Sequence, residues 1–331
     1  MKATVLSDGA WGTALAMTLC RNGHDVTIWG PFADYIEEMK TTRRNDRFLK
    51  GVALPDNLNL TADMPEAIAG SELLVLASPS QYARKTLTLL AESGFQRTQP
   101  IVDVAKGIEL DTLKRMHEIC REILGNRVRY AVLSGPSHAE EVARKVPTLV
   151  TVASKDADLA AFVQQAFMNE VFRVYTSDDV IGVELGGALK NVYAIAAGIC
   201  DGMELGDNSK AALITRGIAE MSRLGTACGG KVKTFSGLSG IGDMIVTCGS
   251  KHSRNRFVGD ELGKGRKLDD IIRDMGMVVA EGVKTAKSAY ELAKLKGVET
   301  PIINEVYAGL YEDKDPRQGL RDLMTREAKE E

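Results

Sequence analysis

Lys190 lies in a stretch where small residues surround it, VELGGALKNVYAIAAG, and this stretch has helical periodicity. Residues three and four apart share a helix face, so the Lys190 face carries Val183, Gly186, Gly187, Ala194 and Ala197. Small neighbours let another helix or a ligand come close. Desolvation would lower the pKa of the Lys190 amine toward a value suited to proton transfer. The alternative is a lysine that reaches solvent from a helix packing face.

Two segments farther along the chain could bind an anion. SGLSGIGDM, residues 236–244, is glycine-rich around Asp243, which suggests backbone close to a ligand, although a loop with a solvated aspartate fits the same pattern. KHSRNR, residues 251–256, precedes a helical stretch with Ser253 as the predicted N-cap. Arg254 and Asn255 then stand in the first turn, where an arginine opposes the helix dipole unless an anion is held there. A surface arginine without a ligand is the alternative.

Further polar residues follow predicted strands in the first half of the chain. Lys106 in DVAKGIE, and Gly135 and Ser137 in LSGPSHAEE, each come after a strand-like run. Open α/β sheets bind their ligands at the carboxyl ends of the strands. We therefore expect these three residues to face one crevice.

The segment LSDGAWGTALA, residues 6–16, lies between the first predicted strand and a predicted helix, Trp11–Cys20. A dinucleotide-binding loop has the pattern Gly-x-Gly-x-x-Gly in this place. Gly9 and Gly12 hold the second and third glycine positions, and Ser7 stands at the first. The two glycines would let the backbone approach a pyrophosphate and let the helix pack on the strand, while the helix N-terminus offers free N–H groups. The loop predicts dinucleotide binding, with a plain strand–turn–helix as the alternative.

Asp8 in the same loop puts a carboxylate close to where a pyrophosphate would lie. Repulsion between the two charges predicts that Asp8 weakens dinucleotide binding. Two other outcomes stay open. The side chain points into solvent, or it bonds the N–H groups of the loop in place of the turn that the missing glycine would make.

The end of the second predicted strand, TIWGPF, bears on the choice of dinucleotide. An acid there would bind the adenosine ribose of NAD, and a nearby arginine would accept the 2′-phosphate of NADP. Gly30 and Pro31 supply neither group, Asp34 comes a little late, and Arg43 and Arg44 lie farther along the chain. We expect NAD(P)H as the cofactor, with a slight lean to NADP(H) because no acid stands in the way.

The secondary structure that must position these residues changes near residue 177 from alternating strands and helices to helices alone. Before it, short β-rich runs alternate with longer amphipathic segments, which indicates βαβ units and a mostly parallel sheet. The polar stretch 43–55 is predicted as a loop. The predicted strands are Thr4–Leu6, Val26–Trp29, Leu73–Ala77, Ile101–Val104, Tyr130–Leu133, Leu149–Ala153 and Phe172–Thr176.

Beyond this point the pattern is helical. We expect an α/β Rossmann-type dinucleotide-binding domain at residues 1–180, followed by an all-helical substrate and catalytic domain at residues 181–331. The predicted helices run from Ser177 or Asp178 to about Cys200, from Asn208 or Ser209 to Gly225, and over residues 254–262, 267–274, 282–296 and 302–312.

The composition is that of an ordinary globular protein. Its 331 residues suggest about two domains, and a net charge of −3 gives no basic field to hold nucleic acid. Five scattered cysteines argue against a zinc site and a disulfide framework, so we expect no metal, reduced thiols and a cytoplasmic location. We see no signal peptide, and we expect no transmembrane segment because no apolar run approaches the roughly 20 residues that span a bilayer.

Several segments, taken in order, resemble the family of bacterial-type NAD(P)-dependent glycerol-3-phosphate dehydrogenases almost from end to end. The long central string and SRNR are highly specific, whereas the opening loop is not. Ser7 and Asp8 depart from the usual Gly-Ala of the family, and Pro31 replaces a basic or histidine residue. The segments are GAWGTALA, AKGIE, LSGPSHAEE, ELGGALKNVYAIAAGICDGMELGDNSKAALITRG, TFSGLSGIGDMIVTC, SRNR, VAEGVKTAK and TPIINEVY.

The resemblance implies reversible hydride transfer between NAD(P)H and dihydroxyacetone phosphate, which gives sn-glycerol 3-phosphate for glycerophospholipid synthesis. It implies that Lys190 is the catalytic lysine and that the active site lies between the two domains. The substrate contacts that it implies are Lys106, Gly135, Ser137, Lys190, Asp243, Ser253, Arg254 and Asn255. The cofactor contacts expected from the loop and the resemblance are Gly9, Ala10, Trp11, Gly12, Lys106, Ala139, Arg254, Val279 and Glu281.

Two other functions stay open. Another two-domain dehydrogenase would act on a hydroxy acid or an acyl-CoA, although SRNR at a helix start favours a compact phosphorylated substrate. A non-catalytic dinucleotide sensor would fit a loop altered at Ser7 and Asp8, although a sensor needs no proton donor such as Lys190. The sequence leaves the oligomeric state open, with a homodimer among the states it allows.

Overall fold

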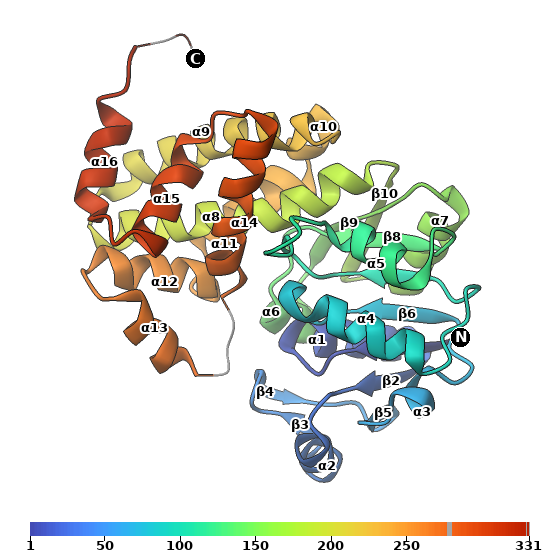
Figure 1. Ribbon diagram of the computed structural model, residues 1–331. Helices are drawn as coiled ribbons and strands as arrows, with labels where there is room; N and C mark the ends of the chain where they lie inside the picture. Colours follow the sequence, from blue (N-terminus) through green and yellow to red (C-terminus); the bar gives the residue numbers. More distant parts are fainter. Residues whose placement is uncertain (277–279, 329, 331) are drawn as a thin grey trace.

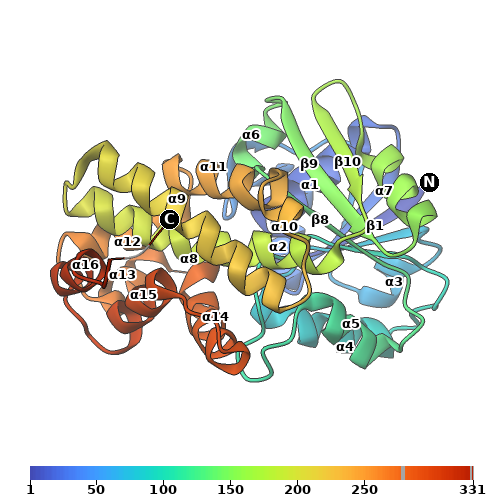
Figure 2. The ribbon, with the colours of Figure 1, turned by 90° about the horizontal axis from the view of Figure 1, so that it is seen from above.

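The computed structural model describes residues 1–276, 280–328 and 330. These residues form two parts, a sheet covered by helices and a helical part, which lie side by side (Figure 1). Seen from above, the long helix α8 (Val180–Gly202) leads from the sheet into the helical part (Figure 2).

The described residues form one eight-stranded sheet in the order β10-β9-β8-β7-β6-β1-β2-β5. Neighbouring strands are parallel except for the antiparallel pair β8 and β9. The strand order reverses between β1 and β6, which is where open α/β sheets bind ligands. The strands are β1 (Lys2–Leu6), β2 (Asp25–Trp29), β5 (Leu58–Thr61), β6 (Leu73–Leu76), β7 (Ile101–Asp103), β8 (Tyr130–Ser134), β9 (Thr148–Ser154) and β10 (Phe172–Ser177).

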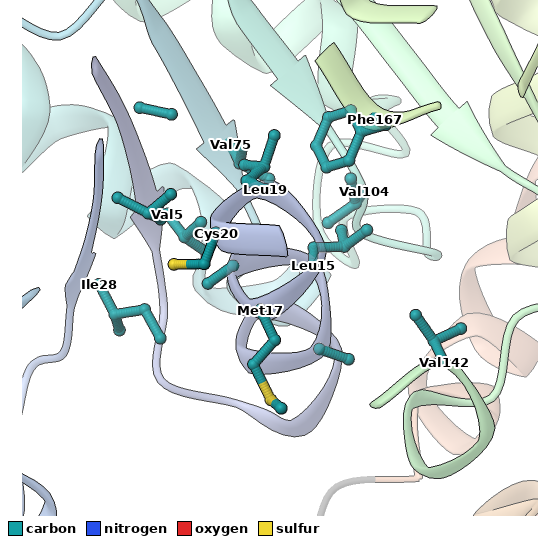
Figure 3. Close-up of a cluster of buried hydrophobic side chains, with 14 of the residues drawn as sticks. Val5, Leu15, Met17, Leu19, Cys20, Ile28, Val75, Val104, Val142 and Phe167 are labelled. Carbon is teal, nitrogen blue, oxygen red and sulfur yellow. The ribbon is translucent and has the colours of Figure 1, made fainter. Parts of the chain in front are cut away.

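Helices cover both faces of this sheet because its strands bury apolar side chains on both sides. Val5 of β1 belongs to the cluster under α1, α6 and α7, and the next residue, Leu6, belongs to the cluster under α3, α4 and α5. Figure 3 shows Leu15 and Leu19 of α1 within the first cluster. The helices of this part are α1 (Ala10–Arg21), α2 (Ala33–Thr42), α3 (Met64–Ile68), α4 (Ala83–Glu92), α5 (Met116–Leu124), α6 (Ala139–Ala143), α7 (Ala157–Phe167) and the 3₁₀ helix η1 (Ser80–Tyr82).

The seven predicted strands are confirmed, each within two residues at either end, and β5 is an eighth that was not predicted. The prediction of a loop over residues 43–55 is wrong. There β3 (Arg44–Asn45) pairs with β4 (Leu49–Ala53) in a short antiparallel hairpin. The hairpin is held from outside its own sequence, because the Tyr35 hydroxyl donates to Asn45 Oδ1 at 2.7 Å and Leu49 is buried in the core.

The helical part surrounds α8. Asp179 caps this helix by accepting the Gly182 N–H at 3.0 Å, so the helix begins just after the predicted start. The later predicted helices are confirmed, most within two residues, while α10, η2, α11 and α16 were not predicted. The other elements are α9 (Gly206–Ala227), α10 (Val232–Phe235), the π-helix η2 (Leu238–Gly242), α11 (Asp243–Gly249), α12 (Arg254–Gly263), α13 (Leu268–Met275), α14 (Glu281–Lys296), α15 (Pro301–Tyr311) and α16 (Pro316–Met324).

Close packing between α8 and α12 brings the SRNR segment to the helix of Lys190. A Cβ added at Gly259 would lie 1.9 Å from the carbonyl oxygen of Ile195, and one at Gly198 would lie 2.0 Å from that of Arg256. Such distances are too short for any side chain, so glycine at both positions lets the two backbones touch.

By length and composition α8 is apolar enough to cross a membrane, contrary to the expectation that no apolar run approaches that length. However, 94% of its most apolar window is buried inside the protein. A helix that is apolar all round serves equally well as the core of a large protein, and α8 does so here.

Candidate active site

Three charged side chains from three separate segments of the chain form a buried cluster. Asp243 is the first residue of α11 and is 1% exposed, and its Oδ2 lies 2.6 Å from Nζ of Lys106. Its Oδ1 lies 3.0 Å from Nζ of Lys190 on α8. Because Lys106 follows β7, the cluster joins the carboxyl edge of the sheet to the helical part. The structure thus brings together three residues that the sequence pointed to separately.

The glycine-rich segment before Asp243 explains the small residues beside Lys190. A Cβ at Gly186 of α8 would lie 2.5 Å from the carbonyl oxygen of Ser239. A Cβ at Gly240 would lie 2.1 Å from the carbonyl oxygen of Phe235. The protein's own backbone in η2 therefore occupies the space beside Gly186, and this packing fixes where α11 begins.

Thr247, one turn after Asp243, completes the surroundings of the Lys190 amine. Its hydroxyl accepts a hydrogen bond from Lys190 Nζ at 2.7 Å and donates to the carbonyl oxygen of Asp243 at 2.6 Å. An ammonium has three N–H donors, of which Asp243 and Thr247 engage two. Sequence reasoning missed Thr247, although its place four residues after Asp243 on a helix puts it on the same face.

Lys106 stands where the carboxyl ends of β7 and β8 meet. Its Nζ donates to the carbonyl oxygen of Gly135 at 3.0 Å and lies 3.4 Å from Ser137 Oγ. Lys106, Gly135 and Ser137 therefore lie together at this edge of the sheet, as expected. Asn191, which was not predicted, donates from Nδ2 to the Lys106 carbonyl oxygen at 3.0 Å and holds the main chain of this lysine against α8.

Burial and mutual charge set the ionisation of the cluster. Burial lowers the pKa of Lys106 to about 8, although the nearby carboxylate of Asp243 opposes this shift. Burial alone would raise the pKa of Asp243, but the positive charges of Lys106 and Lys190 outweigh it and hold that pKa below its usual range. Among the described residues, no group of three or more His, Cys, Asp or Glu side chains could hold a metal ion.

The SRNR segment begins α12 as predicted, because the Ser253 hydroxyl accepts the Arg256 N–H at 3.2 Å. The Asn255 side chain is already engaged, donating to Asn191 Oδ1 and accepting the Gly282 N–H, both at 2.9 Å. Arg254 is half-buried and has no hydrogen-bond or ion-pair partner in the described part of the chain. Of the two residues expected to hold an anion, Arg254 therefore keeps its donors available, while Asn255 ties α12 to α8 and α14.

The loop after β1 has the features that a dinucleotide needs. Gly9 is the N-cap of α1, where no side chain accepts a hydrogen bond from the first turn, so these N–H groups can meet a pyrophosphate. A Cβ at Gly12 would lie 2.7 Å from the carbonyl oxygen of Ser7, which shows why glycine is needed there. Ser7 itself has φ of 154° and accepts the Gly9 N–H at 3.1 Å through Oγ. Ser7 thus makes the turn expected of the first glycine.

The remaining candidate cofactor residues lie on helix starts near this loop or between the two parts. Ala10 and Trp11 open α1, with Trp11 Nε1 buried and unpartnered among the described residues, and Ala139 opens α6 after β8. Glu281 opens α14, and its Oε1 accepts the Ser80 N–H at 2.8 Å, which links the helical part to the loop after β6. Burial raises the pKa of Glu281. Val279 lies outside the described residues.

Two family models together account for most of the chain. One, described as the NAD-dependent glycerol-3-phosphate dehydrogenase N-terminus, matches residues 2–160, and the other, described as the C-terminus of the same enzyme, matches residues 179–321. The chain belongs to the NAD-dependent glycerol-3-phosphate dehydrogenase family.

Members of this family with similar sequences support the assignment along the whole chain. A glycerol-3-phosphate dehydrogenase (NAD(P)+) of Chlorobium phaeobacteroides strain BS1 is 50% identical over 333 residues, with 100% of this chain and 99% of the relative covered. One of Geobacter sulfurreducens is 52% identical, with 99% and 98% covered. The crystal structure of glycerol-3-phosphate dehydrogenase from Coxiella burnetii is 37% identical with a TM-score of 0.94, and the match covers 98% of this chain and 99% of that chain. The expected fold class, a Rossmann-type domain followed by a helical domain, is confirmed.

Proposed function

We propose that this protein catalyses the reversible NAD(P)H-dependent reduction of dihydroxyacetone phosphate to sn-glycerol 3-phosphate, which supplies glycerophospholipid synthesis. The observation that carries the proposal is the buried Lys106–Asp243–Lys190 cluster at the junction of the two parts. Membership of the glycerol-3-phosphate dehydrogenase family supports it. The relatives named above carry this activity in their names.

The reduction needs an electron donor and a proton donor. When bound, NAD(P)H supplies the two electrons and one hydrogen that reduce the C2 carbonyl of the substrate. Lys190 is the proton donor, because two of its three N–H groups are held by Asp243 and Thr247 and the third is left for the carbonyl oxygen. Asp243 holds both lysine amines in place through its two carboxylate oxygens.

Lys106 at the edge of the sheet and Arg254 at the start of α12 bind different parts of the substrate. Lys106 lies beside Gly135 and Ser137 at the sheet edge, where its ammonium stabilises negative charge that develops on the substrate oxygen. Arg254, with no described partner, binds the phosphate of the substrate at the start of α12. Binding of the phosphate, which is unchanged in the reaction, positions the C2 carbonyl for reduction.

The loop after β1 would hold the cofactor in this proposal. Gly9 and Gly12 would leave room for its pyrophosphate, and Ala10, Trp11, Ala139 and Glu281 would be further contacts. We also propose a domain boundary near residue 180, which the end of β10 at Ser177 and the start of α8 at Val180 support. A cytoplasmic location and a homodimer complete the proposal.

An assay with purified protein tests the activity. Oxidation of NADH and of NADPH is followed at the nicotinamide absorbance with dihydroxyacetone phosphate, with glyceraldehyde 3-phosphate and pyruvate as control substrates. We expect turnover that depends on dihydroxyacetone phosphate and exceeds that with either control by orders of magnitude. Dinucleotide binding without turnover would favour a sensor instead, and faster turnover with pyruvate would favour a hydroxy acid dehydrogenase.

A further inference from the structure

Asp8 and Gly30 lie next to each other at the carboxyl edge of the sheet. β1 and β2 are parallel neighbours with Leu6 opposite Trp29, so the residues that follow them leave the sheet side by side. A Cβ added at Gly30 would lie 3.0 Å from Cγ and 3.1 Å from Oδ2 of Asp8. The Asp8 carboxylate therefore occupies the space where a side chain at position 30 would begin.

The protein holds Asp8 firmly through its main chain but leaves part of its carboxylate unsatisfied. Asn45 of the β3–β4 hairpin donates from Nδ2 to the carbonyl oxygen of Asp8 at 2.7 Å. The Asp8 residue is 4% exposed, and its Oδ2 has no hydrogen-bond partner among the described residues. A buried carboxylate oxygen without a donor is costly, which points to a ligand that supplies the donor.

The position of Asp8 in the fold identifies the ligand group that would donate to its carboxylate. In dinucleotide-binding folds an acid about 20 residues beyond the glycine loop, at the end of the second strand, accepts a hydrogen bond from the adenosine ribose. Position 30 is this place, and here it holds glycine. Asp8 brings a carboxylate to the same place from the end of the first strand.

Two of the three arginines near this hairpin are already engaged by other groups of the protein. Arg43 donates to the carbonyl oxygen of Leu58 at 3.0 Å and to that of Pro55. Arg44 pairs with Asp46 at 2.8 Å. Arg47 is exposed and lies with its guanidinium carbon 3.8 Å from the centre of the Tyr35 ring.

We propose that Asp8 accepts a hydrogen bond from the adenosine ribose of the dinucleotide and makes the enzyme prefer NAD(H) to NADP(H). The proposal rests on the proposed function, and it replaces the slight lean to NADP(H) that the end of the second strand suggests. The Asp8 side chain is buried and does not point to solvent. It lies beside Gly30, at the end of the second strand, where dinucleotide-binding folds hold the adenosine ribose. A 2′-phosphate there would face a buried carboxylate of the same charge.

Binding measurements on the enzyme without substrate test this role. The dissociation constants of NADH and NADPH are measured by nicotinamide fluorescence for the wild type, Asp8→Asn, Asp8→Ala and a control, Asp34→Asn. Asp34 is an exposed acid in the first turn of α2, so the control removes one charge nearby without touching the loop. The melting temperature of each ligand-free protein is measured alongside.

We expect the wild type to bind NADH at least about ten-fold more tightly than NADPH, as one charge-assisted hydrogen bond allows. Asp8→Asn and Asp8→Ala should each weaken NADH binding by about ten-fold, and Asp8→Ala should strengthen NADPH binding. Asp34→Asn should leave both constants unchanged. Ligand-free Asp8 variants should melt at or above the wild-type temperature, because they lose a buried carboxylate whose Oδ2 has no partner.

Other results would overturn the assignment. Equal loss of affinity for both dinucleotides with a lower melting temperature would show that Asp8 only maintains the fold. Tighter binding of both dinucleotides by Asp8→Ala would show repulsion of the pyrophosphate instead. A wild type that reduces dihydroxyacetone phosphate without preferring NADH, and whose Asp8 variants keep the same ratio, would refute this inference alone. A wild type that binds neither dinucleotide would refute the proposed function as well.

Discussion

The Lys106–Asp243–Lys190 cluster and the loop after β1 both lie at the carboxyl edge of the sheet, but they differ in how their polar atoms are satisfied. In the cluster each carboxylate oxygen of Asp243 has a lysine within 3.0 Å. In the loop, Oδ2 of Asp8 and Nε1 of Trp11 are buried without partners among the described residues. The groups assigned to proton transfer are therefore assembled before any ligand binds, whereas the loop has buried polar atoms that no described protein group satisfies.

The difference follows from what each region must do. Groups that act on developing charge gain most when they need not reorganise during the reaction. Groups that bind a ligand need free hydrogen-bond donors and acceptors. If those groups were already bonded within the protein, no donor or acceptor would remain for the ligand. Arg254 resembles the loop in this respect, since it too has no partner in the described structure.

The largest effect is expected from Lys190→Ala. Loss of the proton donor should lower kcat by about 10²- to 10⁴-fold, while NADH binding measured by fluorescence changes little, because the loop is untouched. Lys210→Ala on α9 is the control, since Lys210 pairs with Asp201 away from the cluster at 2.5 Å. Turnover within about three-fold of the wild type would refute the role of Lys190.

Asp243→Asn tests whether the cluster is as tightly coupled as its geometry indicates. Removing the carboxylate leaves two buried lysines without their counter-charge, which should lower the free energy of unfolding by about 3–5 kcal/mol. Asp201→Asn is the matched control, because Asp201 also bridges two cations, Lys210 and Arg256, but is about one-fifth exposed. Its loss should cost about 1 kcal/mol or less. If denaturant titrations showed that Asp243→Asn and Asp201→Asn destabilise the protein equally, the Lys106–Asp243–Lys190 cluster would not be more tightly coupled than the exposed one.

Arg254→Ala tests the proposed role of Arg254 in binding the substrate phosphate. A charge-assisted contact of about 1.5–3 kcal/mol corresponds to roughly a ten- to hundred-fold rise in KM for dihydroxyacetone phosphate. Cofactor binding should weaken too, if Arg254 also touches the dinucleotide. Lys251→Ala removes an exposed cation three positions earlier and should leave KM unchanged. An unchanged KM in Arg254→Ala would place the phosphate elsewhere.

The smallest expected effect is a pH dependence of substrate affinity. Lys106 has a pKa lowered to about 8 by burial, so it is charged below pH 8 and becomes neutral as the pH rises through that value. The dissociation constant of sn-glycerol 3-phosphate should therefore increase several-fold between pH 7 and pH 9.5. Lys106→Arg, whose guanidinium stays charged throughout this range, should show a flatter profile. A wild-type constant that does not vary with pH would argue against contact between Lys106 and the substrate.

Much of the architecture could be predicted from the chain because it depends on local pattern. Apolar runs bounded by turn residues predicted seven strands of the sheet, and the Ser253 cap predicted the start of α12. The hairpin at residues 44–53 could not be predicted this way. Its sequence is polar and irregular, and buried contacts with Tyr35 and the loop after β1 stabilise it.

The sequence by itself determined which residues we propose for the chemistry: a lysine among small residues at 190, an aspartate in a glycine-rich turn at 243 and an arginine in a helix start at 254. Only the tertiary structure decided how they meet. Lys106 and Asp243 are 137 positions apart, and Asp8 meets the space beside Gly30 because two strands are neighbours in the sheet. Periodicity describes contacts within a few residues, whereas these contacts depend on how whole elements pack.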